Sequence, residues 1–213
     1  MNSKLKTKLI EIARTKYSTD DPSHDFNHIL RVLSNIESIV KEEKADLDIL
    51  IPAALFHDVV NYPKNDPKAK FSSDESAIVV KKVLENIKEY PRHKIAQVEY
   101  AVSVCSFNKG IIPNTLEAKI LQDADGLEAT GAISIMRTYA SAGQMKINFY
   151  NQKDPFCKKR KPEALQYALD LFYQRLLKIK ERCHTKKGKK IAERRTRFLL
   201  KFLKELEQEL KGE

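Results

Sequence analysis

The sequence contains few of the features that define disulfide-bonded, sheet-rich or membrane proteins. Its three cysteines show no Cys-x-x-Cys spacing and form neither a disulfide framework nor a zinc ribbon. Six glycines among 213 residues are too few for a sheet-rich fold with many tight turns. The longest uninterrupted apolar run, residues 49–56, is short and contains a proline, whereas a bilayer-spanning helix needs about 20 residues. With no signal-peptide core near the N-terminus, we expect a soluble, cytoplasmic protein with no membrane partner.

Apolar residues recur at three- and four-residue steps along almost the whole chain, which is typical of amphipathic helices. One such stripe begins at Phe26 and continues through Ile29 and Leu33. No run alternates apolar and polar residues as a half-buried strand does. We therefore predict an all-α fold. It comprises a helical bundle over residues 1–155 and a basic hairpin of two long helices within residues 156–213, packed on the bundle.

The most apolar helix of the chain is expected to begin near residue 48. Asp48 can serve as its N-cap, its first turn tolerates Pro52, and its pattern runs toward Val60. His57 and Asp58 directly follow its apolar residues. At the edge of a helix that faces the core, an unpaired charge is costly, and a divalent cation would compensate for it.

Two other segments place histidine and aspartate beside stretches that resemble a core. His24 and His28 lie four residues apart at the start of the stripe from Phe26, and Asp123 and Asp125 follow an apolar helical pattern. Imidazole suits borderline transition metals and carboxylate suits harder ions, so a mixed set leaves positions open for water and substrate. One buried histidine is more often hydrogen-bonded in a core than bound to metal. Only the combination of these segments indicates a metal site.

Together these segments resemble the H…HD…D signature of the HD-domain metal-dependent phosphohydrolase superfamily. The similarity is to small stand-alone bacterial-type HD hydrolases, some of which act on nucleoside triphosphates, and it covers residues 20–155. It implies an all-α HD-domain fold and one divalent ion, whose identity (Mn, Mg, Co, Ni, Fe or Zn) the donor types leave open. The implied ligands are His28, His57, Asp58 and Asp125.

Asp125 is preferred to Asp123 because the family pattern is Ala-Asp-x-Leu, which residues 124–127 match. The sequence departs from the family pattern at two positions. Cys105 stands where a further histidine is expected, which argues against a complete second metal site. Gly126 stands where a basic residue is expected, which argues against an arginine contact to substrate phosphate there.

The function that the resemblance implies is hydrolysis of a phosphoester or phosphoanhydride in a nucleotide or small phosphorylated metabolite by metal-activated water. A divalent ion lowers the pKa of its bound water toward about 7 and polarises a phosphoryl oxygen. Phosphoryl transfer further needs positive potential around the phosphate oxygens. The candidate substrate-binding residues that could supply it are His24, Arg31, Lys109, Arg137 and Lys146.

Two carboxylates are candidate catalytic residues. Asp58 belongs to the implied metal site, and Glu75, which follows the next loop, could orient the attacking water. Glu75 has a second interpretation as a first-turn carboxylate that interacts favourably with a helix dipole. The sequence leaves both roles open.

The basic excess of the chain lies in its C-terminal two-fifths. The formal net charge is +10; residues 131–213 contain 21 Lys and Arg against 9 Asp and Glu, and residues 1–130 contain 18 against 20. This charge is consistent with solvated helix faces, with a rim that attracts anionic substrate, or with a nucleic-acid-binding helical module whose HD site is vestigial. An apolar seam over residues 191–210 is consistent with internal packing or a homodimer contact.

Overall fold

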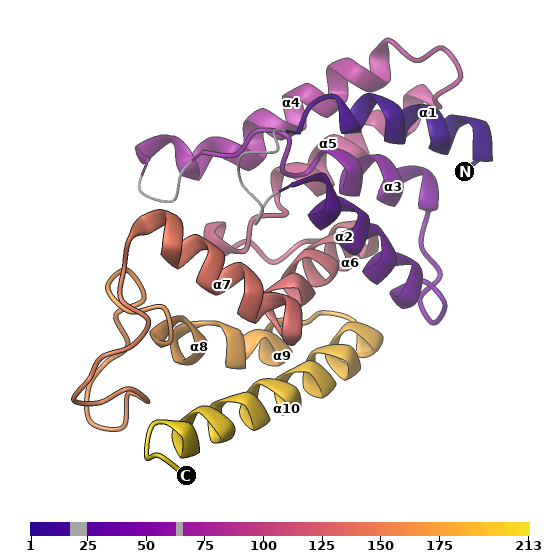
Figure 1. Ribbon diagram of the computed structural model, residues 1–213. Coiled ribbons are helices and arrows are strands. Elements are labelled where there is room, and N and C mark those ends of the chain that lie inside the picture. Colours follow the sequence, from indigo (N-terminus) through magenta and orange to yellow (C-terminus); the bar gives the residue numbers. More distant parts are fainter. Residues whose placement is uncertain (18–24, 63–65) are drawn as a thin grey trace. The chain divides into compact units, whose positions relative to one another are not determined.

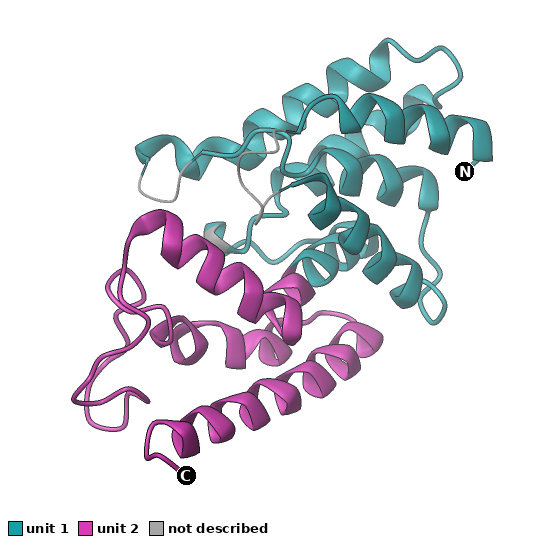
Figure 2. Ribbon diagram, viewed as in Figure 1, with its two compact units in different colours: residues 1–125 teal, residues 126–213 magenta. Residues whose placement is uncertain are grey.

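The computed structural model describes residues 1–17, 25–62 and 66–213, apart from the side chain of Asn108. The chain forms two compact units, residues 1–125 and 126–213 (Figure 2), and the sequence-based division at residue 155 stays a prediction. Every regular element in the described ranges is a helix, besides one isolated bridge between Asn148 and Tyr167. The prediction of an all-α fold is confirmed. None of the described helices combines the length and the apolar composition that crossing a membrane requires.

Unit 1 contains α-helices joined by short 3-10 turns (Figure 1). Its elements are α1 (Ser3–Arg14), α2 (Phe26–Ile39), α3 (Leu47–Phe56), η1 (Pro67–Phe71), α4 (Ser72–Glu85), η2 (Arg92–Lys94), α5 (Ile95–Ser103), η3 (Phe107–Lys109) and α6 (Leu116–Gly126). α3 lies at the centre and contacts α1, α2, α4 and α5. Every residue from Ile49 to Phe56 is buried, because a helix that is apolar on all sides needs cover on all sides.

The start of α3 differs from the prediction. Asp46, rather than Asp48, is the N-cap, and its carboxylate accepts a hydrogen bond from the Asp48 N–H at 2.8 Å. Pro52 therefore lies beyond the first turn, where it has no N–H to donate to the carbonyl of Asp48. The hydroxyl of Tyr90 donates to that carbonyl at 2.8 Å instead. A distant side chain thus satisfies the backbone group that the proline leaves without its helical partner.

Unit 2 ends in a long helix, α10, which runs along one side of the unit (Figure 1). Its elements are η4 (Leu127–Ala129), α7 (Ala132–Met145), α8 (Asp170–Gln174), η5 (Leu176–Lys178), α9 (Ile179–Arg182) and α10 (Lys186–Glu209). Leu199 and Leu203 of α10 are buried in a cluster with Leu169 and Phe172. Phe172 also stacks on Phe202, with ring centroids 5.8 Å apart. These members of the predicted seam pack inside unit 2.

The first arm of the predicted hairpin is interrupted. In place of one long helix, the chain forms α8, η5 and α9, with a break at Arg175, whose φ and ψ are −135° and −55°. Leu169, Phe172, Leu176 and Ile179 are all buried and keep a helical spacing across the break. The apolar pattern therefore predicted a continuous helix, and only the backbone angles show the interruption.

A buried ion pair fixes the loop that precedes α8. The carboxylate of Asp170 is fully buried and accepts hydrogen bonds from both terminal nitrogens of Arg160 at 2.5 and 2.6 Å. It also accepts the N–H of Glu163 at 2.7 Å. Burial alone would raise the pKa of Asp170, but these donors outweigh it and lower the pKa below its usual value. The start of α8 is thereby tied to the loop.

We expect Asp170→Asn to lower the free energy of unfolding by about 3 kcal/mol at neutral pH, since it leaves Arg160 without its carboxylate partner. A lowered pKa adds stability that is present above the unfolded-state pKa and is lost as pH falls through the folded-state value. The difference in free energy of unfolding between wild type and variant should therefore become smaller below about pH 4. Urea titrations at pH 7 and pH 3.5 measure it, and equal stabilities at pH 7 would contradict the role assigned to the pair.

Gly131, at the start of α7, occupies a position that only glycine suits. Its φ is +79° and its ψ is −163°, a region that other residues rarely adopt. A Cβ at this position would lie 3.0 Å from Cγ of Arg195. The Arg195 side chain passes this point and donates to the carbonyl of Leu127 at 2.7 Å. The glycine therefore permits both the turn and the contact from α10.

Gly131→Ala should lower the free energy of unfolding by about 1–3 kcal/mol, because it adds both strain and a steric clash. Gly143 is a matched control, since it lies within α7 and a Cβ there would meet nothing within 4 Å. Gly143→Ala should raise stability by about 0.5–1 kcal/mol. Chemical denaturation of both variants tests the difference, and a change of the same sign in both would refute it.

Candidate metal centre

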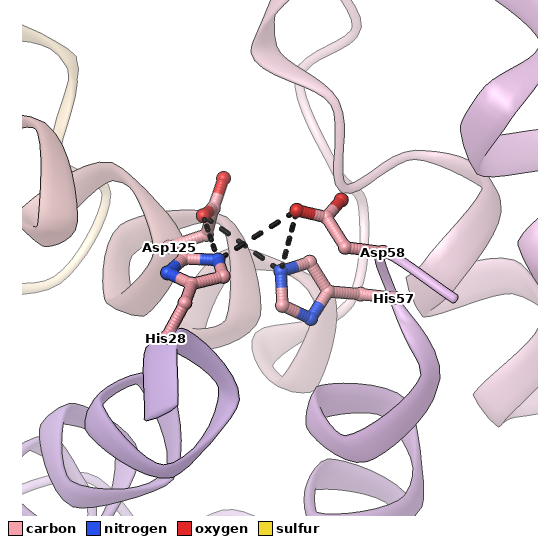
Figure 3. A group of neighbouring side chains, drawn as sticks. All are labelled: His28, His57, Asp58 and Asp125. Atoms are coloured by element: carbon pink, nitrogen blue, oxygen red, sulfur yellow. Dashed lines mark ion pairs between the residues drawn. The ribbon is translucent and has the colours of Figure 1, made fainter. Parts of the chain in front are cut away.

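Four side chains from three helix ends converge in unit 1. His28 lies in the first turn of α2, His57 and Asp58 follow α3, and Asp125 lies at the end of α6 (Figure 3). One potential ligand atom from each of the four lies within 4.8 Å of all the others. Helices that are far apart in sequence thus bring together the residues that the H…HD…D resemblance implied.

The position of His28 follows from the way α2 begins. Asp25 is the N-cap, and its carboxylate accepts a hydrogen bond from the N–H of His28 at 2.9 Å, which satisfies a backbone donor of the first turn. The apolar stripe of α2 faces the core, and His28 lies on it with no exposed surface. Asp25 has no role in the predictions above, although its type and place are those of an N-cap.

The position of His57 follows from the way α3 ends. The helix stops at Phe56, short of the predicted extension to Val60, and His57 is its C-cap. Nδ1 of His57 lies 2.8 Å from the carbonyl oxygen of Ala54. A carbonyl only accepts, so Nδ1 carries the proton and Nε2 offers its lone pair. Such a backbone contact is how proteins orient a histidine ligand.

The distances within the cluster fit ligands around a single ion. Nε2 of His28 lies 3.6 Å from Oδ2 of Asp58 and 3.5 Å from Oδ1 of Asp125. Nε2 of His57 lies 3.6 and 3.7 Å from the same oxygens. It is buried and has no hydrogen-bond partner among the described residues. Nitrogen and oxygen ligands about 2.1 Å from one ion are about 3 to 4 Å from each other, so the four groups could hold a divalent cation.

The cluster is closed on the histidine side and open on the carboxylate side. The imidazoles are at most 1% exposed, whereas the side chains of Asp58 and Asp125 are 31% and 26% exposed. An ion held here would therefore be shielded from water on the imidazole side and accessible to water and substrate on the carboxylate side.

The charges in the cluster stabilise one another. Burial alone would raise the pKa of Asp58, but the neighbouring imidazoles outweigh it and lower the pKa to about 2. The pKa of Asp125 is likewise lowered by both imidazoles against the effect of burial. For His57, burial favours the neutral ring, but the two carboxylates prevail and raise its pKa. Both carboxylates are thus ionised at neutral pH and offer two negative charges to a cation.

Comparison with known proteins identifies the family. The model of the HD domain matches residues 25–130, a range that contains all four clustered residues. The Bacillus subtilis protein YpgQ is 30% identical over 199 residues, which cover 91% of this chain and 88% of YpgQ. The chain belongs to the HD-domain family. The resemblance drawn from the sequence is confirmed.

Solved structures of similar proteins share the fold over nearly the whole length of this chain. The Lin1889 protein from Listeria innocua has a TM-score of 0.75 at 30% identity, and a Bacillus thuringiensis HD-superfamily hydrolase has 0.71 at 26%; each match covers 99% of this chain and 98% of the other. The structure of YpgQ in complex with ADP has a TM-score of 0.72 at 26% identity, with 97% of this chain and 98% of YpgQ covered. Membership of this family implies a hydrolase and a divalent metal ion.

The cluster of His28, His57, Asp58 and Asp125 is supported by polar residues that the sequence patterns did not single out. The buried amide of Asn35 on α2 donates to the carbonyl of Ala124 on α6 at 3.0 Å, next to Asp125. Gln122, one turn before Asp125, donates to the carbonyl of Val104 at 3.1 Å. These contacts fix the end of α6. A polar side chain on an apolar helix face was the signal that could have revealed them.

Two further residues lie close enough to the carboxylates of Asp58 and Asp125, called here the HD carboxylates, to be affected by their charge. Tyr17 donates to the carbonyl of Leu55 at 3.0 Å, and burial and the charge of Asp58 raise the pKa of its hydroxyl. Burial, then Asp125 and Asp58, raise the pKa of the Cys105 thiol well above its usual value. The thiol of Cys105 therefore stays protonated at neutral pH. Cys105 is also not one of the four residues of the cluster.

The remaining predicted site residues are in varied settings. Glu75 lies in the first turn of α4 and accepts a hydrogen bond from the Tyr62 hydroxyl at 2.8 Å. The ammonium of Lys109 is paired with Asp74 at 2.6 Å and donates to the carbonyl of Ser103 at 2.9 Å. An internal partner therefore already offsets the positive charge that was expected to face a phosphate.

The other candidates for phosphate contacts are separated along the chain. Arg31 lies on α2, one turn beyond His28, and is half-buried. Arg137 lies on α7 and Lys146 is the C-cap of that helix, so both residues belong to unit 2. His24 lies outside the described residues. Asp123 is buried but is not one of the clustered residues.

We expect Asp125→Asn to abolish binding of Mn²⁺, because it removes an ionised ligand, whereas Asp123→Asn should retain it. A metal ion that binds only the folded protein at 100 times its Kd adds about 2.7 kcal/mol of stability. Calorimetric titration with Mn²⁺ and thermal melts with and without the ion measure both effects. Loss of binding in Asp123→Asn but not in Asp125→Asn would reverse the assignment.

Proposed function

We propose that this protein is a metal-dependent phosphohydrolase that cleaves a phosphoester or phosphoanhydride bond of a nucleotide or small phosphorylated metabolite. The observation that carries the proposal is the His28, His57, Asp58 and Asp125 cluster, with buried imidazoles and partly exposed carboxylates. Membership of a family that includes an HD-superfamily hydrolase supports it. All four positions of the HD signature hold ligand-type residues, which disfavours a vestigial site.

The residues of this chain fit the tasks of such a reaction. When bound, a divalent ion supplies Lewis-acid polarisation of a phosphoryl oxygen and an acidified water. The imidazoles of His28 and His57 offer neutral nitrogen donors, and the carboxylates balance the charge of the ion. The Nδ1 contact of His57 to Ala54 keeps its donor nitrogen aimed at the site.

Asp58 and Glu75 are the proposed catalytic residues. Asp58 would be a ligand of the ion, and its carboxylate is partly exposed. Glu75 would orient the attacking water, and its hydrogen bond from Tyr62 fixes one carboxylate oxygen for that task. The other role of Glu75, at the N-terminal end of α4, is electrostatic and structural. The two roles predict different effects of the same substitution.

A nucleotide is the proposed substrate class. The support is the solved complex of YpgQ, a relative over nearly the whole chain, with ADP. We assign a phosphate contact to Arg31, which follows His28 by one turn of α2. We extend the same role to His24, Lys109 and Arg137. For Lys109 this requires exchange of its Asp74 contact for the phosphate.

A nucleotide panel with added Mn²⁺, Mg²⁺, Co²⁺ or Ni²⁺, assayed separately for phosphate and pyrophosphate, tests the function. Hydrolysis should depend on the metal, and Asp58→Ala should lower kcat/KM by more than about 100-fold, since loss of residues that only support metal ligands already costs 10–100-fold. Glu75→Gln should lower kcat at unchanged KM if the carboxylate orients water. Undiminished turnover by metal-free Asp58→Ala protein would refute the proposal. Lower stability of Glu75→Gln at unchanged kcat would assign the structural role.

A further inference from the structure

The solvent face of α10 has a continuous row of positive charge. Six exposed basic residues, which we call the basic stripe, lie within about 80° of one another around the helix and extend over about 27 Å of its length. They are Lys186, Lys190, Arg194, Arg197, Lys201 and Lys204. α10 forms one long side of unit 2 (Figure 1).

The basic stripe far outnumbers its acidic neighbours, which include Glu193 beside Lys190 and Arg197 and Glu205 beside Lys201. Successive members are three or four residues apart, so they are direct neighbours on the helix surface, where like charges destabilise the helix. None of the ion pairs found among the described residues includes a member of the stripe. Elsewhere on α10 the usual arrangement occurs, since Glu207 pairs with Lys158 at 2.6 Å and lies 4.0 Å from Lys211.

The charges of α10 also oppose its own dipole. The first turn contains Lys186 and Lys189 and no acidic residue, and the last turn contains Glu207 and Glu209 and no basic one. A helix is stabilised by the reverse arrangement, with acidic residues first and basic residues last. Helix stability therefore does not explain the stripe. Charges that destabilise their own helix, with no ion pair to offset them, are expected at a functional site.

The opposite face of α10 is already occupied. Ala192, Thr196, Leu199 and Leu203 are buried. An amphipathic helix that enters a lipid surface needs a free apolar face, and this one has none to offer. Phe198 and Leu200 are exposed midway along the helix, but at 100° per residue they lie on opposite flanks of the basic stripe and do not form one apolar face. The contact of Lys158 with Glu207 brings the basic loop before α8 to the C-terminal end of the same helix.

We propose that the basic stripe binds the phosphate backbone of double-stranded nucleic acid. A straight, rigid row of cations suits a regular row of phosphates, and contacts to phosphate carry no sequence information, so such binding would be independent of sequence. Single-strand binders stack bases on aromatic residues, and Phe198 is the one exposed aromatic residue of α10. A second copy of unit 1 offers no acidic surface of matching excess, since residues 1–125 contain 18 basic and 19 acidic residues.

The test compares two variants of the full chain that lose the same charge. Lys190→Gln, Arg197→Gln and Lys201→Gln together remove three of the six charges of the stripe, and Lys41→Gln, Lys44→Gln and Lys88→Gln remove three exposed charges from unit 1. Fluorescence anisotropy with a labelled 20-base-pair DNA duplex, an RNA duplex and the matching single strands measures binding between 50 and 200 mM salt. Vesicles containing phosphatidylserine probe a lipid surface.

Wild type and the unit 1 variant should bind the duplexes alike, with affinity falling steeply as salt rises. The stripe variant should bind at least about 10-fold more weakly, with a salt slope reduced by about one for each phosphate that it no longer neutralises. Its thermal midpoint should stay close to that of wild type, because the repulsion that is removed offsets the lost attraction to Glu193 and Glu205. Asp58→Ala should bind duplex as wild type does, so failure of the metal site and failure of the stripe are distinguishable.

Four results would overturn the proposal. The first is no duplex binding by wild type at 50 mM salt. The second is equal weakening in both triple variants, which would show an effect of net charge only. The third is binding to single strands alone, and the fourth is binding to the anionic vesicles without binding to the duplexes.

Discussion

Two imidazoles held with almost no exposure to water, each facing two carboxylates, form the interaction on which unit 1 depends. Burying such groups is costly unless they are compensated; without a cation, a protonated imidazole would compensate the carboxylates across 3.5 to 3.7 Å. The spacing is longer than a hydrogen bond and matches that of ligands sharing an ion. The same distances that relieve the cost of burial thus prepare the site for a cation.

The residues of this site lie at the ends of helices, and backbone hydrogen bonds at those ends orient them. Asp25 caps α2 at His28, Nδ1 of His57 meets the last turn of α3, and Asn35 holds the end of α6 beside Asp125. Helix ends are where backbone groups lack helical partners. The interactions that begin and end the helices therefore also aim the metal-ligand candidates, and no separate scaffold is needed.

The sequence was informative wherever a pattern is local. Helical periodicity predicted the all-α class, histidine and aspartate next to apolar runs indicated a metal site, and the resemblance to the H…HD…D signature implied the four residues that the structure brings together. What it could not predict depends on distant contacts: Tyr90 completing the hydrogen bonding of α3 around Pro52, and the break at Arg175, which leaves the apolar spacing unchanged. Cys105 illustrates the same limit, because its nearness to the HD carboxylates arises only from the fold.

The arrangement of charge on α10 makes ionic strength act on unit 2 in two opposite ways. Salt screens the repulsion between neighbouring cations and weakens the unfavourable interaction of the first-turn lysines with the helix dipole, so the isolated helix is best ordered in concentrated salt. Attraction to any external anion declines over the same range. High salt therefore keeps the helix ordered while it weakens the attraction of the stripe for anions. The protein at high salt would be an intact structure that has lost its long-range electrostatic attraction, rather than a partly unfolded one.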